Sequence, residues 1–107
     1  MSGLVSVFAL FGSAAEAERI AREVVGEGLA ACANILGPCR SVYRWEGRIE
    51  EADEVPAIFK VTADRAEALI AAIAGRHSYE VPAITVWAVD RALESYAAWV
   101  RKETGSA

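Results

Sequence analysis

The sequence predicts an α+β fold in which extended and helical segments follow the order βαββαβ, with one further helix at the C-terminus. Runs that are apolar at nearly every position, typical of buried strands, alternate with segments whose apolar residues recur at helical spacing. A very short turn joins two long extended runs, which requires antiparallel pairing. This is the split βαβ, or ferredoxin-like, arrangement, in which two helices cover one face of a four-stranded antiparallel sheet.

The first strand and the first helix have the clearest local signals. The stretch from Leu4 to Phe11 is apolar at nearly every position and predicts a central strand. Ser13 and Glu16 have the spacing of a capping box, which predicts the start of a helix. The apolar residues from Ala17 to Val24 recur at helical spacing, and two glycines mark the end of this helix.

A long hairpin is predicted in the middle of the chain. Its first arm is an extended run from Leu29 to Trp45, interrupted at Gly37-Pro38, where we expect a kink or bulge because proline cannot donate to a ladder. Glu46-Gly47-Arg48 forms the turn, and the second arm runs from Ile49 to Val61. Pro56 predicts that part of this arm lies at an edge or a bulge.

The last third of the chain repeats the pattern. Asp64 with Glu67 predicts the start of a second helix, which Gly75 is expected to close. A fourth strand is predicted from Ile84 to Val89. One face of the last helix is predicted to carry the apolar residues Leu93, Tyr96, Ala97 and Val100.

The hairpin arms predict association with other copies of the chain. Each arm has about 14 residues and would span roughly 46 Å. A compact domain of this length has a diameter of about 34 Å. The hairpin would then project beyond its own domain and expose an apolar tip that includes Tyr43 and Trp45, which a second chain could cover. The alternative is that Gly37-Pro38 folds the tip back onto its own sheet.

Composition limits the classes of function. We expect one domain over residues 1–107. The net charge of −4 and scattered basic residues argue against a nucleic-acid partner. The apolar N-terminus is too short for a membrane helix and lacks a basic region and a cleavage site, so we expect a cytoplasmic protein with no membrane partner. In that compartment Cys32 and Cys39 are expected to be free thiols.

Several segments in order resemble the CutA divalent-cation tolerance proteins. The segments are LAACANI at residues 29–35, SVYRWEG at 41–47 and HSYEVP at 77–82, followed by Tyr96 and Trp99. The resemblance implies a ferredoxin-like fold and a homotrimer linked by the long hairpins, with an architecture similar to that of PII-type signalling proteins. It also implies a role in tolerance of, and response to, copper and other divalent metal ions, and it implies no catalysed reaction.

The metal-binding positions of the family are only partly matched. Its His-Pro-Tyr-Glu-x-Pro pattern is met at His77, Tyr79, Glu80 and Pro82. Ser78 replaces the first proline, and Arg76 stands where copper-binding members have a first histidine. Ala9 and Leu10 occupy the region of the first strand where those members have a cysteine.

Three side chains are the candidate ligands for copper or another divalent cation. His77, Cys39 and Cys32 supply the imidazole and thiolates that copper and zinc favour. The two cysteines are too far apart along an extended strand for easy chelation within one chain, so we expect any site to lie between subunits. The alternative for His77 is a residue at a helix end that forms local hydrogen bonds.

The sequence also bears on two further classes of function, catalysis and the sensing of a small ligand. The chain carries no G-x-S-x-G, phosphate-binding glycine loop or H-E-x-x-H motif, so we expect no enzyme. The alternative to a metal-tolerance protein is a PII-like sensor of a small ligand, or a signalling or scaffold trimer without a specific metal site. The residues expected to line its cleft are Trp45, Lys60, Tyr79 and Glu80.

Overall fold

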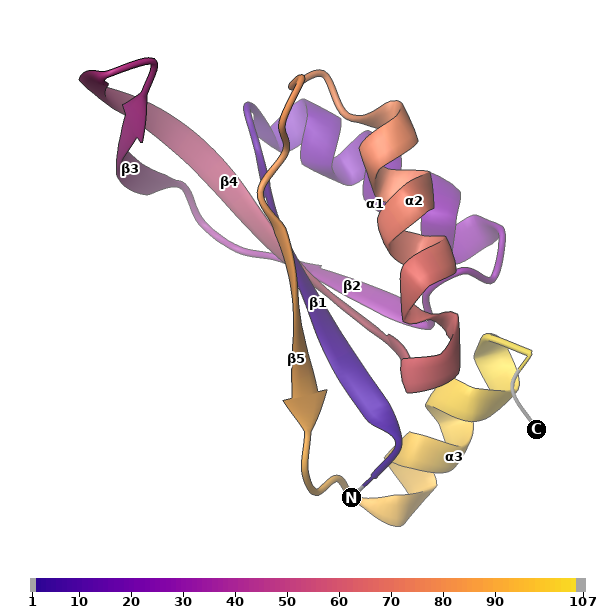
Figure 1. Ribbon diagram of the computed structural model, residues 1–107. Coiled ribbons are helices and arrows are strands. Elements are labelled where there is room, and N and C mark those ends of the chain that lie inside the picture. The colour runs from indigo at the N-terminus through magenta and orange to yellow at the C-terminus, as the bar shows by residue number, and fades with distance from the viewer. Residues whose placement is uncertain (1, 106–107) are drawn as a thin grey trace.

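The strand β1, Leu4–Phe11, runs through the middle of an antiparallel sheet in the computed structural model, which describes residues 2–105 (Figure 1). It pairs with β4, Arg48–Thr62, on one side and with β5, Ile84–Val89, on the other. The short strand β2, Cys32–Ile35, pairs with the outer edge of β4, so the order is β2-β4-β1-β5. The α+β class and the bounds of the first and last strands are as predicted.

Two helices cover one face of this sheet. They are α1, Ala14–Gly26, and α2, Ala66–Arg76, which lie side by side (Figure 1). Alternate residues of β1, from Val5 to Phe11, point into the core between the sheet and these helices. Ser13 caps α1 as predicted, because its hydroxyl accepts a hydrogen bond of 3.2 Å from the Glu16 amide.

The opposite face of the sheet is covered only at one end. The helix α3, Glu94–Glu103, packs Ala97 and Val100 against Leu4 and Ala31. The rest of this face carries partly exposed apolar side chains, which the strand register places in rows. We call the following residues the open face: Ser6, Phe8, Ile58, Lys60, Trp87 and Cys32.

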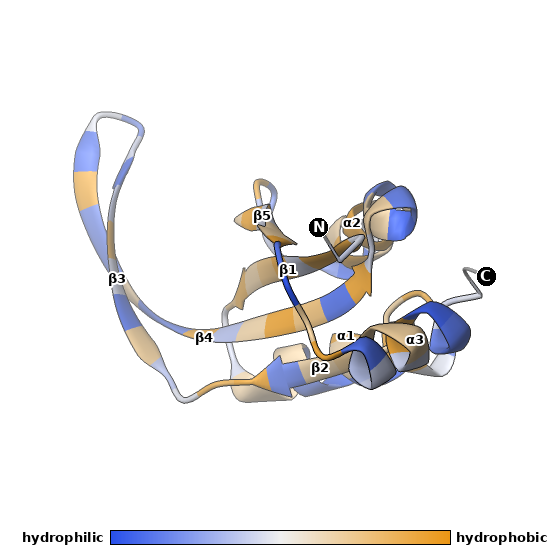
Figure 2. Ribbon diagram, turned by 90° about the horizontal axis from the view of Figure 1, so that it is seen from below, coloured by the Kyte–Doolittle hydropathy of each residue, from blue (hydrophilic) through white to orange (hydrophobic). Residues whose placement is uncertain are grey.

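The central hairpin projects from the body of the molecule. It is formed by β3, Cys39–Trp45, and the first half of β4, and it curves away from the helices (Figure 2). Its turn places Glu46 and Gly47 at φ 49° and 78°, which is the left-handed region that two-residue hairpin turns use. The molecule measures 45 Å along its longest axis against 25 and 23 Å along the others, so the hairpin overshoots the domain as expected.

A bulge separates the hairpin from the sheet. Between the pairs Ile35–Ala57 and Cys39–Glu54, three residues of one strand lie opposite two of the other. The extra residue falls at Gly37-Pro38, as predicted, and it divides the single predicted arm into β2 and β3. Pro56 lies opposite the bulge, where its carbonyl accepts a hydrogen bond from the Leu36 amide.

Three local predictions were wrong. Asp64 lies inside a short 3-10 helix, Ala63–Arg65, and α2 begins after it without a side-chain cap. Gly75 does not close α2, which continues to Arg76. Leu93 is 75% exposed at the start of α3, because this helix covers the sheet with its next turns.

Within residues 2–105, no helix is both long enough and apolar enough to cross a membrane.

Candidate functional site

The segment that follows α2 is held to the rest of the fold by three consecutive residues. His77, Ser78 and Tyr79 make hydrogen bonds to β1, α1 and β4 respectively. Each bond uses a different element of the fold, so this short segment has little freedom to move relative to the sheet. We call residues 77–83 the site loop.

His77 is buried and both of its ring nitrogens are engaged. Its side chain is 0% exposed and stacks on Phe11 with ring centroids 5.0 Å apart. Nδ1 accepts a hydrogen bond of 3.0 Å from the Tyr79 amide, so in the neutral ring the proton resides on Nε2. Nε2 then donates to the Leu10 carbonyl over 2.7 Å. Neither nitrogen presents a free lone pair to a metal ion.

Ser78 is bound by a carboxylate of α1. The Ser78 amide and hydroxyl donate to the two oxygens of Glu16 over 2.8 and 3.0 Å. Burial tends to raise the pKa of Glu16, but the two hydrogen bonds from Ser78, together with the nearby His77 and a backbone hydrogen bond from Gly12, outweigh it and lower the pKa overall. Glu16 therefore does not complete the reciprocal capping box with Ser13 that its spacing suggested, because its carboxylate holds the site loop.

Tyr79 reaches across to the root of the hairpin. Its hydroxyl donates to Oε2 of Glu54 over 2.9 Å. Burial, followed by this hydrogen bond and the nearby negative charge of Glu54, raises the pKa of Tyr79 to about 12. A side chain at Gly12 would meet the Tyr79 hydroxyl at 3.1 Å, so the absence of a Cβ there lets the phenol approach Glu54.

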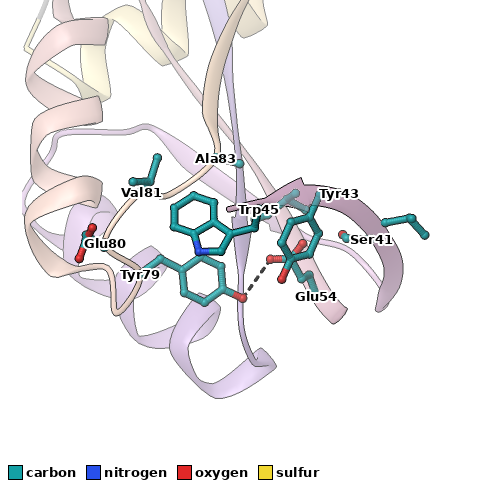
Figure 3. Close-up of a pocket in the computed structure, with 10 residues that line it drawn as sticks. Ser41, Tyr43, Trp45, Glu54, Tyr79, Glu80, Val81 and Ala83 are labelled. Carbon is teal, nitrogen blue, oxygen red and sulfur yellow. Dashed lines mark hydrogen bonds between the residues drawn. The ribbon is translucent and has the colours of Figure 1, made fainter. Parts of the chain in front are cut away.

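A cavity of about 580 Å³ lies between the site loop and the concave side of the hairpin (Figure 3). The hairpin contributes Tyr43, Trp45 and Glu54, and the site loop contributes Tyr79 and Glu80. The volume lies within the range of about 300–1,000 Å³ that is usual for small-molecule sites. The cavity is therefore the candidate functional site, and its volume is suited to binding a small molecule.

Three of the four residues predicted to line a cleft lie in this cavity. Trp45, Tyr79 and Glu80 are among its lining residues. Lys60 is not, since it pairs with Ser6 and Cys32 on the open face. Its position in the strand alternates with buried core residues, and that alternation turns it to the side of the sheet away from α1 and α2.

The three predicted metal ligands are not brought together within one chain. The Cys32 thiol lies 3.5 Å from the Tyr96 hydroxyl, whereas the Cys39 thiol lies 3.9 Å from Ser41 at the root of the hairpin. His77 is committed to its own hydrogen bonds. Among residues 2–105 no group of three or more His, Cys, Asp or Glu side chains could hold a metal ion. The described residues of a single chain therefore assemble no complete metal site.

Sequence reasoning missed Glu54. An acidic stretch from Glu50 to Glu54 suggests a solvated strand edge in the sequence, yet Glu54 is only 7% exposed. The register explains the difference, because Glu54 pairs with Cys39 on the hairpin face that also carries Tyr43 and Trp45. A period of two along the hairpin was the available signal, but the bulge made its phase unreadable from sequence.

Known proteins resemble this chain in sequence and in fold. The family model described as "CutA1 divalent ion tolerance protein" matches residues 5–103. The chain belongs to this family. The "Divalent-cation tolerance protein CutA" of Yersinia pestis (strain Pestoides F) is 37% identical over 86 residues, which cover 80% of this chain and 72% of the relative. The resemblance seen in the sequence is thus confirmed.

Solved structures of the family share the fold. CutA1 from Pyrococcus horikoshii superimposes with a TM-score of 0.88 at 39% identity, covering 94% of this chain and 97% of its own. The "Periplasmic divalent cation tolerance protein CutA" of Archaeoglobus fulgidus gives a TM-score of 0.91 at 32% identity, covering 94% of this chain and 98% of its own. Membership of the CutA1 family therefore rests on both sequence and fold.

Proposed function

We propose that this CutA1-family chain works as a homotrimer in the response to divalent metal ions, in the cytoplasm and without catalysing a reaction. In this proposal the domain has the ferredoxin-like topology, and the hairpin of each subunit packs on its neighbour. Family membership supports the link to divalent ions. The observation that carries the assembly is the projecting hairpin together with the open face.

Both surfaces leave apolar side chains in water when the chain is alone. At the hairpin tip Val42 is 65% exposed and Ile49 is 64% exposed, and Trp87 on the open face is 51% exposed. Burying a large apolar side chain stabilises by about 1.5–3 kcal/mol. Neighbouring copies that cover these side chains would recover that free energy for all subunits at once.

Any metal in this proposal binds between subunits. A single chain forms no cluster of ligands within residues 2–105, so a complete site needs donors from two chains. Cys39 is the candidate nearest the hairpin, and Cys32 is the candidate on the open face. Copper and zinc would accept these thiolates together with carboxylates from a neighbour.

Light scattering and calorimetry test these two statements separately. At micromolar concentration we expect three times the 11.4 kDa mass of one chain. Titration with Cu²⁺ and Zn²⁺ should give heats that Cys39→Ser reduces, with His77→Gln as the matched control because its nitrogens are already occupied. A monomer would refute the assembly, and equal heats for Cys39→Ser, Cys32→Ser and the unmodified chain would refute thiolate binding.

Two further experiments test the proposed absence of catalysis and the proposed cytoplasmic location of the protein. If Cys32 and Cys39 are ordinary thiols, both should react with an alkylating reagent no faster than free cysteine does. Faster reaction would point to an activated nucleophile. Fractionation of cells that express the protein should recover it with cytoplasmic markers, and recovery in the periplasmic fraction would contradict the proposed location.

A second candidate is a sensor of a small ligand, and the cavity favours it. The cavity has the volume of a small-molecule site, and its aromatic walls belong to the hairpin and the site loop. A ligand bound there would contact the element that we propose joins subunits. A thermal-shift screen with amines, organic anions and metal ions distinguishes the candidates. Stabilisation by an organic compound alone would favour the sensor, and stabilisation by metal ions alone would favour the metal proposal.

A further inference from the structure

The cavity between the hairpin and the site loop combines aromatic walls with negative charge. Tyr43, Trp45 and Tyr79 provide the rings, and Figure 3 shows the Tyr79 hydroxyl bonded to the Glu54 carboxylate. Glu80 supplies a second carboxylate at the site loop. None of the described residues that line the cavity is a lysine, an arginine or a histidine.

Glu54 is held in position but keeps acceptor capacity. It is 7% exposed, so water has little access to it. The Tyr79 hydroxyl donates to Oε2, and this is the one hydrogen bond that the carboxylate makes within residues 2–105. A carboxylate can accept several hydrogen bonds, which leaves Oε1 available to a further donor.

The charge of this carboxylate favours a cationic ligand over an anionic one. Bringing an anion next to the buried Glu54 carboxylate would place like charges together in a partly desolvated place, which is unfavourable. The faces of tyrosine and tryptophan rings attract cations within about 6 Å of the ring centre. Carboxylate and rings therefore select the same sign of charge.

The same lining disfavours a bare metal ion. Divalent cations bound through oxygen take about six to eight ligands, or about six with near-ideal geometry for magnesium. Among residues 2–105 no group of three acidic, cysteine or histidine side chains is placed for this. An ammonium group carried on an apolar body needs only one carboxylate and a ring face, and its body can fill the apolar remainder of the cavity.

We propose that the cavity binds a small organic ammonium ion, with the ammonium group between Glu54 and the aromatic rings and its hydrocarbon part toward Val81. The inference deepens the sensor candidate by naming the class of ligand. It is independent of metal binding at the thiols.

Three probes that share one ring and differ in charge test the proposal. Benzylammonium, benzyl alcohol and benzoate are titrated calorimetrically into the unmodified protein at neutral pH. We expect benzylammonium to bind at least about tenfold more tightly than benzyl alcohol, and benzoate to bind more weakly than both. Equal affinities for the three, or no binding by benzylammonium, would overturn the proposal.

A matched pair of variants locates the binding. Glu54→Gln keeps an acceptor for the Tyr79 hydroxyl and removes the charge, and we expect it to weaken benzylammonium by about tenfold while leaving benzyl alcohol unchanged. Glu51→Gln removes the same charge from an exposed position that pairs with Arg40, and should have no effect. Equal losses in both variants would mean long-range electrostatics and would contradict a site at Glu54.

The outcomes separate this inference from the proposed function. Tight binding of benzoate at the cavity would refute the ammonium ion and retain the sensor. Light scattering and metal titration of the same Glu54→Gln sample report on assembly and thiolate binding. A trimer that responds to metal ions but ignores all three probes would leave the metal proposal standing and refute this one.

Discussion

Three neighbouring side chains of the site loop determine where one wall of the cavity lies. His77, Ser78 and Tyr79 point in different directions, and each has a hydrogen-bond partner on a separate element. The His77 ring fixes the position of the site loop, since its two nitrogens bond the Leu10 carbonyl of β1 and the Tyr79 amide. A family histidine that looks like a ligand in the sequence is in this chain a positioning residue.

The Glu16 carboxylate should contribute stability that depends on pH. Its pKa is lowered in the folded chain, so its contribution is present above the ordinary pKa of about 4.3 and is lost as pH falls through the folded value. We expect Glu16→Gln to lower the free energy of unfolding by about 1–2 kcal/mol at neutral pH, because hydrogen bonds to a charged group are lost.

Urea unfolding at a fixed protein concentration, repeated from neutral to acidic pH, measures this effect. The difference between Glu16→Gln and the unmodified protein should shrink toward acidic pH. Glu18→Gln is the control, since Glu18 lies exposed on the same helix and forms an exposed ion pair with Arg22 at 3.8 Å. A difference for Glu16→Gln that stays constant across the pH range would contradict the assignment.

The Tyr79 hydroxyl should lose its proton at a higher pH than an ordinary tyrosine does. Burial and the Glu54 hydrogen bond raise its pKa to about 12 in the folded chain, against about 10 for an ordinary tyrosine. Stability from this group is fully present below about pH 10 and is lost as the pH rises toward the folded value. The tyrosinate absorbance of the unmodified protein minus that of Tyr79→Phe should rise with a midpoint near the folded pKa. A midpoint near the ordinary value would show that the phenol is not held by Glu54.

At the scale of elements, two glycines with equal free space should respond in opposite ways to alanine. A Cβ at Gly75 or at Gly47 would meet nothing within 4 Å, so crowding plays no part. Gly75 lies within α2, and Gly75→Ala should stabilise by about 0.5–1 kcal/mol through helix propensity. Gly47 has φ +78°, and Gly47→Ala should destabilise by about 1 kcal/mol or more. Thermal unfolding measures both, and a stabilised Gly47→Ala would refute the conformational argument.

The elements were predictable to the extent that their signals are local. The bounds of β1 and β5 and the cap at Ser13 follow from apolar runs and from a hydroxyl that bonds a nearby amide. The start of α2 was misjudged because Asp64 resembles a cap, whereas the backbone there forms a 3-10 turn. The partner of Tyr79 lies 25 positions away at Glu54, and only the register across the bulge reveals it.

At the scale of the molecule, α1 and α2 cover one face of the sheet, and α3 covers one end of the other face. Phe8 stacks on Trp87 at 5.2 Å between ring centroids, and both lie outside the cover that α3 provides. The described residues of one chain leave both this apolar surface and the hairpin tip exposed. The proposed homotrimer would cover both surfaces.

A charge on the open face should weaken the proposed assembly without unfolding the subunit. Trp87 is 51% exposed, so Trp87→Asp removes little from the core between the sheet, α1 and α2. We expect its mass in light scattering to fall toward that of one chain at low micromolar concentration, with its helical circular dichroism retained. Ala71→Asp adds the same charge at an exposed position of α2 and should remain assembled. An unchanged mass for Trp87→Asp would exclude the open face from the interface.

The bulge at Gly37-Pro38 determines which insertions the hairpin arms can accept. Beyond the bulge, the register of β3 and β4 is set by their own two-residue turn, independently of the pairing in the sheet. Because side chains alternate with a period of two, one residue added to each arm below Tyr43 would rotate the cavity-facing rings to the outside, and two added to each arm would return them. Hairpins of this kind can thus lengthen only in even steps if they are to keep the same inner surface.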